Sequence, residues 1–198
     1  MNDENLHREG VFDPKHASSL DEPWRINELK PYELLENMIG IKAGYTCIDF
    51  GSGTGTFALP MAELAGKEGK VYAVDNSEVM MEHIKANNPP PQIVPVLSDV
   101  QQTGLDDGIA DICFLAFILH EVKQPEKLIG EAARLMKPDG KIVVLEWSMD
   151  ADTPMPPKHR RISREKIEEL FGQTDLTLTS FIERTANHYV AMGLKRAS

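Results

Sequence analysis

Cysteine is scarce in this chain. Its 198 residues include two cysteines, Cys47 and Cys113, and each lies inside a short apolar run. Neither belongs to a C-x-x-C pair or to a cluster with histidine, so the sequence has no metal-site signature and we expect no bound metal. We expect both thiols to be small core residues, and the low cysteine content is typical of a reducing, cytoplasmic location.

Positive charge and long apolar runs are also lacking. The chain has 31 Asp and Glu against 21 Lys and Arg, a net charge of −10, which repels phosphate backbones and argues against nucleic acid as a partner. No apolar run approaches the roughly 20 residues of a membrane span. The polar start Asn2–Asn5 differs from a signal peptide. We therefore expect a soluble cytoplasmic protein with no membrane partner.

The length and composition fit a single domain over residues 1–198. Apolar residues make up 41% of the chain, which is enough for a sizeable core. Residues 1–22 are polar and show no sustained period, so they predict a partly ordered arm ahead of a core at 23–198. Asp21 is positioned to cap a helix that Pro23 opens.

Short apolar runs alternate with helical patterns through the middle of the chain. Such alternation predicts a parallel α/β sheet with right-handed crossovers. Pro95 inside the third run places that strand at the sheet edge. A turn is expected at 137–140, and the last two runs predict an antiparallel hairpin. The expected strands are 46–50, 70–75, 93–97, 111–116, 141–147, 176–182 and 187–192.

Three glycines at alternate positions follow the first strand. Strand, glycine turn and helix together let backbone N–H groups approach a ligand at a helix N-terminus. The dinucleotide motif G-x-G-x-x-G would need a third glycine where Thr56 stands. Asp49, at the strand end, would repel a pyrophosphate but suits a ligand with an ammonium group, such as S-adenosylmethionine (AdoMet). The loop residues expected to bind the ligand are Gly51, Ser52, Gly53 and Gly55.

Polar or flexible residues also follow the other strands, and parallel strand ends meet at one edge of a sheet. Asp75 could accept hydrogen bonds from ribose hydroxyls, or it could cap the next helix, where Asn76 or Ser77 can take over that capping. Asp99 could accept from an adenine amino group while the Val100 N–H donates to the ring; alternatively, Asp99 only forms a turn. Met80 could lie against adenine or pack in the core.

These motifs together resemble the class I AdoMet-dependent methyltransferases. Residues 47–55 match that family's first motif and 71–75 its second, while 97–100 and 110–117 are similar to the third and fourth. Residues 134–141 are similar to the segment that leads into the family's fifth strand. The resemblance covers about residues 40–192 and is greatest for small enzymes related to the ubiquinone/menaquinone biosynthesis C-methyltransferases. It is weaker for arsenite methyltransferases, whose chemistry uses several cysteines.

The resemblance implies a Rossmann-like seven-stranded sheet of order 3-2-1-4-5-7-6, with strand 7 antiparallel and helices on both faces. It implies that Asp49 and the glycine loop hold the methionine part of AdoMet, Asp75 the ribose, and Asp99 with Val100 the adenine. Ala116 and Phe117 would flank the sulfonium. S-adenosylhomocysteine would be the product.

Methyl transfer requires alignment of a nucleophile, and a base only where the acceptor must lose a proton. His120 follows the fourth strand and is the candidate base, or else a structural histidine. Glu146 could bind a cationic acceptor or orient His120, and it needs a partner if buried. Glu121 is expected to point away into solvent, and Trp147 to line the acceptor pocket or to pack.

Two long segments with little regular structure are expected to close the acceptor pocket: 12–24 and the proline-rich stretch 150–159. With no inserted cap domain, the acceptor is a small molecule or is reached through a homodimer. The function predicted is AdoMet-dependent methyl transfer to a small-molecule acceptor by in-line displacement. The alternatives are an NAD(P)-dependent oxidoreductase and an AdoMet-binding protein without catalytic activity.

Overall fold

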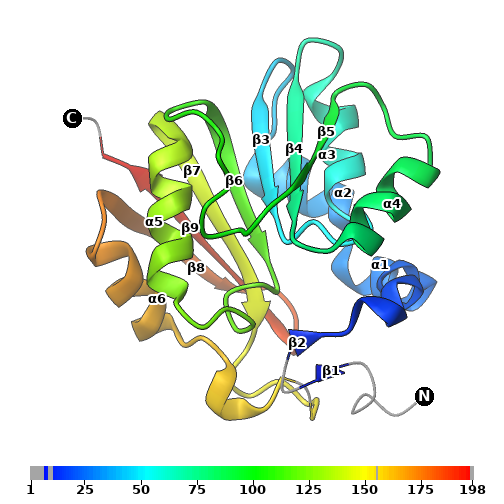
Figure 1. The fold of residues 1–198 in the computed structure, drawn as a ribbon. Helices are drawn as coiled ribbons and strands as arrows, with labels where there is room; N and C mark the ends of the chain where they lie inside the picture. Colours follow the sequence, from blue (N-terminus) through cyan, green and yellow to red (C-terminus); the bar gives the residue numbers. More distant parts are fainter. Residues whose placement is uncertain (1–6, 9–10, 155, 197–198) are drawn as a thin grey trace.

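A seven-stranded sheet organises the computed structural model, which describes residues 7–8, 11–154 and 156–196 (Figure 1). The strand order is β5-β4-β3-β6-β7-β9-β8, and β9 runs antiparallel to both of its neighbours. Numbered along the chain from β3, this is the predicted order 3-2-1-4-5-7-6. The strands are β3 (Thr46–Phe50), β4 (Lys70–Asp75), β5 (Ile93–Leu97), β6 (Ala110–Ala116), β7 (Met136–Trp147), β8 (Leu176–Glu183) and β9 (His188–Lys195).

Helices cover both faces of this sheet (Figure 1). Side chains alternate along β6, so that Phe114 faces one layer and Cys113 the other. One core layer contains α3 (Ala58–Ala65), α4 (Glu78–Ala86) and the π-helix η3 (Leu34–Ile39). The opposite layer contains α5 (Pro125–Leu135) and α6 (Arg164–Gly172). The central strands are therefore apolar on both sides, as their sequences predict.

Side-chain caps start two of these helices. Ser77 precedes α4 and its hydroxyl accepts from the Met80 N–H at 3.4 Å. Ser163 precedes α6 and accepts from the Lys166 N–H at 3.3 Å. Because Ser77 caps α4, the carboxylate of Asp75 at the end of β4 is released from that task.

The N-terminal segment is more regular than predicted. Residues 14–21, expected to be an irregular arm, form the 3-10 helix η2 (Pro14–Asp21), and α1 (Pro23–Leu29) and α2 (Pro31–Glu33) follow. Glu22, not Asp21, occupies the cap position of α1, because the Asp21 carboxylate binds side chains of other elements instead. Before η2 lies a two-stranded hairpin of β1 (His7–Arg8) and β2 (Val11–Phe12). Residues 1–6 and 9–10 of the predicted arm lie outside the described residues.

The turn predicted at 137–140 is wrong in its extent. These residues belong to β7, which reaches back to Met136 and pairs it with Ala110. An irregular register follows, and Asp139 has a φ of 61°, so the strand is distorted where the turn was expected. The distortion lies at the start of β7, at the opposite end of the strand from Trp147.

Among the described residues, none of the helices has the length and apolar character needed to cross a membrane. Within the same ranges, no group of three or more His, Cys, Asp or Glu could hold a metal ion. A short 3-10 helix, η4 (Lys158–Arg160), interrupts the proline-rich stretch before α6.

Candidate active site

A cavity of about 710 Å³ lies at the carboxyl ends of β3, β4, β5, β6 and β7. The rim of the sheet where these strands end faces the N-terminal segment in Figure 1. Most of the predicted site residues line the cavity. They are Gly51, Ser52, Gly53, Asp75, Asn76, Met80, Asp99, Val100, Ala116, Phe117, His120 and also Trp147. Asp49, Gly55 and Glu146 lie behind the lining.

The glycine loop adopts backbone conformations that favour glycine. Gly51 has a φ of 67° and Gly53 a φ of 53°. A β-carbon added to Gly51 would lie 2.9 Å from Ile118 Cδ1, and one on Gly53 would lie 3.0 Å from Leu20 Cδ1. The loop therefore has both a conformational and a steric need for glycine, and its bare backbone forms part of the cavity wall.

The carboxylate of Asp75 ties the second strand to this loop. Its Oδ2 accepts from the Gly53 N–H at 3.0 Å, and its Oδ1 accepts from the Ser77 N–H at 2.9 Å. Burial raises the pKa of Asp75, while the backbone donors at Ser77, Gly53 and Asn76 act to lower it. Each carboxylate oxygen can accept further bonds. Asp75 can thus orient the glycine loop and still receive two ribose hydroxyls from the cavity.

Asp49 lies beneath the loop. It is 1% exposed, and within the described ranges its Oδ2 has no hydrogen-bond partner. Burial raises the pKa of Asp49 to about 8, and Asp75 adds to the effect, while a hydrogen bond from the Ala58 N–H opposes it. A carboxyl group with this pKa is mostly protonated at pH 7, and a neighbouring cation would favour its ionised form. Its contact with the ammonium group of a cofactor stays a prediction.

The expected adenine side differs among its three residues. Met80 and Val100 are buried and line the cavity. Asp99 is exposed, and its Oδ1 accepts from the Gln101 N–H at 2.9 Å, which is the turn geometry that was the alternative for this residue. The carboxylate can still reach a ligand, since Asp99 also lines the cavity.

His120 and Glu146 form a buried pair. His120 Nδ1 lies 3.0 Å and 2.8 Å from the two carboxylate oxygens, and its backbone N–H donates to Oε1 at 3.3 Å. The Trp147 N–H donates to Oε2 at 3.2 Å. Glu146 is fully buried and is not among the lining residues, which favours the predicted role of orienting His120 over that of binding an acceptor. His120 Nε2 has no hydrogen-bond partner among the described residues.

The charge of Glu146 controls the titration of His120. Burial by itself lowers the pKa of His120, but the charge and hydrogen bond of Glu146, with a contribution from Glu121, outweigh burial and raise the pKa. The Glu146 carboxylate contacts the imidazole through Nδ1. Nε2, which lies 3.9 Å from Glu121 Oε1, is the nitrogen that could accept a proton once the ring is neutral.

The prediction that Glu121 points into solvent is wrong. Its side chain is 15% exposed, lines the cavity, and accepts from the Phe12 N–H at 3.1 Å. Burial raises the pKa of Glu121 to about 7, and His120 acts against this. Arg160 donates to the carbonyl oxygens of His120 and Glu121 at 3.1 Å and 3.2 Å, and so holds the backbone of the turn after β6 that carries Glu121.

An aromatic group stands beside the His120–Glu146 pair. The ring centroid of Phe117 lies 5.4 Å from that of Trp147 and 5.1 Å from that of His188, and the Trp147 and His188 centroids are 4.5 Å apart. Phe117 has a φ of 56°, a costly conformation for a bulky residue, and its N–H donates to Leu145 O at 2.8 Å. All three line the cavity, so Trp147 takes the pocket-lining role of its two predicted roles.

The cavity residues that sequence reasoning missed include Arg25, Glu28, Asn187 and His188. The last two had a detectable signal. An antiparallel last strand must begin at the edge where the parallel strands end, and His188 indeed pairs with Trp147. Arg25 and Glu28 had no such signal because α1 reaches the cavity through tertiary packing. The Arg25 guanidinium lies 5.7 Å from the centroid of the Phe117 ring.

His188 contrasts with His120. Burial lowers the pKa of His188 to about 4, although Glu28, whose carboxylate lies 3.6 Å away, acts to raise it. This imidazole is therefore neutral near pH 7. Its Nε2 has no partner among the residues that the structure describes.

Both predicted covering segments reach the cavity. Phe12, Pro14, Ser19, Leu20 and Trp24 contribute from the N-terminal side, and Asp152 and Thr153 from the proline-rich stretch. The N-terminal segment also covers the glycine loop, as the contact between Leu20 and Gly53 shows.

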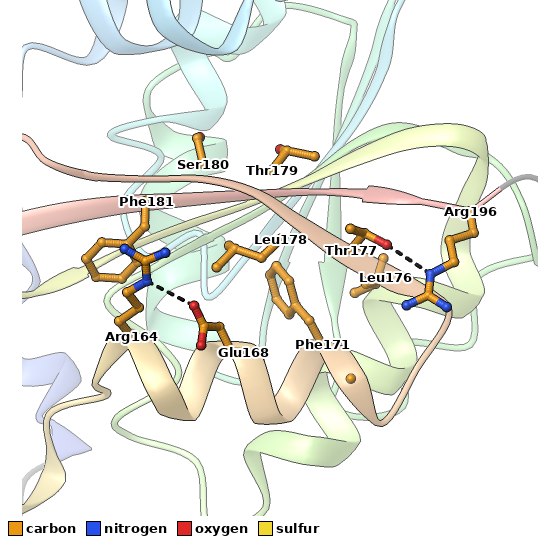
Figure 2. Close-up of a pocket in the computed structure, with 11 residues that line it drawn as sticks. Arg164, Glu168, Phe171, Leu176, Thr177, Leu178, Thr179, Ser180, Phe181 and Arg196 are labelled. Carbon is orange, nitrogen blue, oxygen red and sulfur yellow. Dashed lines mark hydrogen bonds and ion pairs between the residues drawn. The ribbon is translucent and has the colours of Figure 1, made fainter.

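A second cavity of about 380 Å³ lies between α6 and the edge strand β8 (Figure 2). Its charged groups already have partners, because Arg164 donates to Glu168 and Arg196 donates to Thr177 Oγ1, each at 2.9 Å. The glycine loop and the His120–Glu146 pair are elsewhere. The cavity at the strand ends is therefore the candidate active site.

Comparison with known proteins agrees with this geometry. The family model described as the methyltransferase domain matches residues 48–144, which run from the first strand of the sheet to the fifth. The chain belongs to the class I AdoMet-dependent methyltransferases. The matched range contains the glycine loop, Asp75 and His120, while Arg25, Glu28 and His188 lie outside it.

Two relatives have names that describe their function. The chain is 31% identical over 158 residues to 2-phytyl-1,4-naphtoquinone methyltransferase of Nostoc punctiforme, covering 78% of the chain and 61% of that relative. It is 33% identical over 111 residues to the ubiquinone/menaquinone biosynthesis C-methyltransferase of Cupriavidus taiwanensis, covering 55% and 46%. The chain spans about half the length of the curated relatives that it matches.

A solved structure supports the fold of this chain. The SAM-dependent methyltransferase from Aquifex aeolicus superposes with a TM-score of 0.85 at 24% identity, covering 93% of the chain and 99% of that structure. The seven-stranded arrangement is therefore shared over nearly the whole length of both chains.

Proposed function

We propose that the protein transfers a methyl group from AdoMet to a small-molecule acceptor, with His120 as the base. One observation carries this proposal: a single cavity joins the glycine loop and Asp75 to a buried His120–Glu146 pair, and the Nε2 atom of His120 has no hydrogen-bond partner in the described part of the chain. The first group suits a nucleoside cofactor and the second suits removal of a proton. An in-line displacement needs both at one place.

Bound AdoMet would supply a methyl carbon already activated by a positively charged sulfur. Ala116 and Phe117, at the end of β6, are placed to flank that sulfur, and Asp75 and Asn76 to hold the ribose. His120 Nε2 takes the proton that the acceptor loses, and Glu146 stabilises the imidazolium that forms. The covering segments exclude water from the reacting atoms.

The acceptor we infer is a neutral ring compound. Phe117, Trp147 and His188 form a wall suited to stacking. The lining of this part of the cavity contains the carboxyl groups of Glu28 and Glu121 and the guanidinium of Arg25. The two carboxyl groups outnumber the guanidinium, which disfavours an acidic acceptor. Ring acceptors also agree with the names of the quinone methyltransferase relatives.

We place the reaction in the cytoplasm, since both cysteines are buried and free, as in proteins of reducing compartments. The division into an arm (1–22) and a core (23–198) within one domain stays a prediction, and a homodimer remains an alternative for completing the acceptor pocket.

Calorimetric titration with AdoMet and NADH tests the cofactor. AdoMet should bind. If NADH binds and AdoMet does not, the proposal is wrong and an oxidoreductase is favoured. Transfer of labelled methyl from AdoMet to a panel of reduced naphthoquinones, hydroquinones and phenols tests the reaction. If AdoMet binds and no panel member is methylated, the alternative of a non-catalytic AdoMet-binding protein gains over ours.

A further inference from the structure

The helix η2 lies across the glycine loop. Leu20 Cδ1 is so close to Gly53 that an added β-carbon would lie 3.0 Å from it, and the Thr56 hydroxyl donates to Leu20 O at 3.5 Å. Ser19, Leu20 and Gly53 all line the cavity. A ligand bound along the loop would therefore lie beneath this helix.

One carboxylate fastens η2 to the elements below it. Asp21 Oδ1 accepts from the Thr54 hydroxyl at 2.6 Å, and Asp21 Oδ2 lies 3.0 Å from His83 Nε2. Thr54 is a buried residue of the glycine loop, and His83 is on α4, the helix that follows Asp75. Asp21 thus bridges the two elements expected to hold the methionine and ribose parts of a cofactor.

Beyond the contacts of Leu20 and Asp21, η2 buries little apolar surface. Ala17 is the one buried residue among its eight, and the helix contains polar residues at most other positions. A short segment with little buried apolar surface opens at low free-energy cost. Breaking the Asp21 contacts should then release it without unfolding the sheet.

We propose that Asp21 is a cofactor-retaining residue, which fastens η2 over the glycine loop so that AdoMet and its product leave only when these contacts open. The inference rests on the proposed function, in which the glycine loop binds AdoMet. It assigns to the N-terminal segment a role toward the cofactor, in addition to its predicted role in closing the acceptor pocket.

Dissociation rates of labelled AdoMet, measured by a chase with unlabelled cofactor, test the proposal. Asp21→Ala should raise the dissociation rate roughly three- to tenfold, because it removes one hydrogen bond to a charged group and one partly exposed ion pair. The association rate should change less. Asp21→Asn, which can keep the bond from Thr54, should give a smaller rise.

Glu22→Ala is the matched control. Glu22 is the exposed neighbour of Asp21, and its side chain makes no cap hydrogen bond to α1. The variant removes the same charge, so an unchanged dissociation rate would separate the Asp21 contacts from general electrostatics. His83→Ala breaks only the second contact. Its effect should largely vanish in the Asp21→Ala background, because Asp21→Ala has already removed the contact between Asp21 and His83.

Three results would overturn the proposal. An Asp21→Ala protein with the wild-type dissociation rate contradicts it and leaves the proposed function intact. Equal acceleration by Glu22→Ala reduces it to a charge effect. Failure of the wild type to bind AdoMet removes both the proposed function and the inference. Should Asp21→Ala fail to fold in a thermal unfolding assay, His83→Ala decides, and an unchanged rate there contradicts the proposal.

Discussion

We call the part of the cavity proposed to bind AdoMet the cofactor half, and the part proposed to bind the acceptor the acceptor half. The two halves are built in different ways. The cofactor half consists mainly of backbone and short side chains that directly follow β3, β4 and β5, within residues 49–100. The acceptor half is assembled from side chains of α1, the turn after β6, and the first residues of β9. The cofactor half depends on local chain geometry, and the acceptor half depends on tertiary packing.

The halves also differ in their electrostatics. In the cofactor half, burial raises the pKa of both Asp49 and Asp75, so a cation would find carboxyl groups ready to ionise. In the acceptor half, two imidazoles are shifted in opposite directions: the pKa of His120 is raised and that of His188 is lowered to about 4. These shifts would suit a positive ligand in one half, and proton transfer beside a neutral hydrogen-bonding group in the other.

The largest expected effect breaks the acceptor half alone. His120→Ala should lower kcat by about 10²–10⁴, the usual contribution of a positioned base, while the AdoMet dissociation constant stays unchanged. Turnover of the best panel acceptor and calorimetry measure the two quantities. His159→Ala, at an exposed histidine of η4, serves as the control. An unchanged kcat for His120→Ala would show that the acceptor loses no proton to this residue.

The converse change breaks the cofactor half. Asp75→Ala should weaken AdoMet binding by roughly 1.5–3 kcal/mol, because it removes hydrogen bonds to a charged group. It also releases the Gly53 N–H from its acceptor. Asp99→Ala is the comparison, since the exposed Asp99 carboxylate forms a turn and its loss should cost less than about 1 kcal/mol. Equal affinities for wild type and Asp75→Ala would refute the ribose assignment.

A smaller effect sharpens the contrast between the histidines. Since the base form of His120 exists only above its pKa, kcat/KM of the wild type should rise with pH through a value above 6.5 and then level. Glu146→Gln removes the charge that raises this pKa. The rise should move to lower pH, and the plateau should fall because the ring is less basic. A pH–rate profile measures both, and an unmoved midpoint would assign the titration to another group.

The smallest expected effect concerns His188. His188→Leu should raise the KM of a dihydroxylated ring acceptor severalfold, which corresponds to the loss of one neutral hydrogen bond of about 0.5–1.5 kcal/mol. His188→Asn should restore part of it, and the AdoMet affinity should not change in either variant. If KM stays constant and kcat falls instead, His188 acts on the reacting atoms and the division of roles between the two histidines is wrong.

The difference between the halves explains what could be predicted from the sequence. Strand ends, glycines and acids such as Asp75 stand next to one another along the chain, so the strands and most of the cofactor wall were predictable, while the strand order came from the family resemblance. The buried partner of Glu146 was also foreseeable, because an unpaired carboxylate inside the core is costly. Arg25 and Glu28 were not, since nothing near them in the sequence shows where α1 packs.

Two errors have the same physical origin. Asp21 was expected to cap a helix and Glu121 to face solvent, because both judgements considered only neighbours in the chain. Distant groups decide both outcomes: Thr54 and His83 draw Asp21 away from α1, and Arg160 holds the turn that carries Glu121. Short polar segments with few local preferences take their conformation from such partners.

The reversed direction of β9 has an evolutionary consequence. The loop between β8 and β9 opens onto the same rim as the parallel strands, yet it lies near the other end of the chain from the glycine loop. Insertions or substitutions around Arg184–Asn187 can therefore alter which molecules are accepted while the nucleoside-binding machinery is left intact. After gene duplication, descendants of such a chain could diverge in substrate choice through one hairpin and still share the same methyl donor.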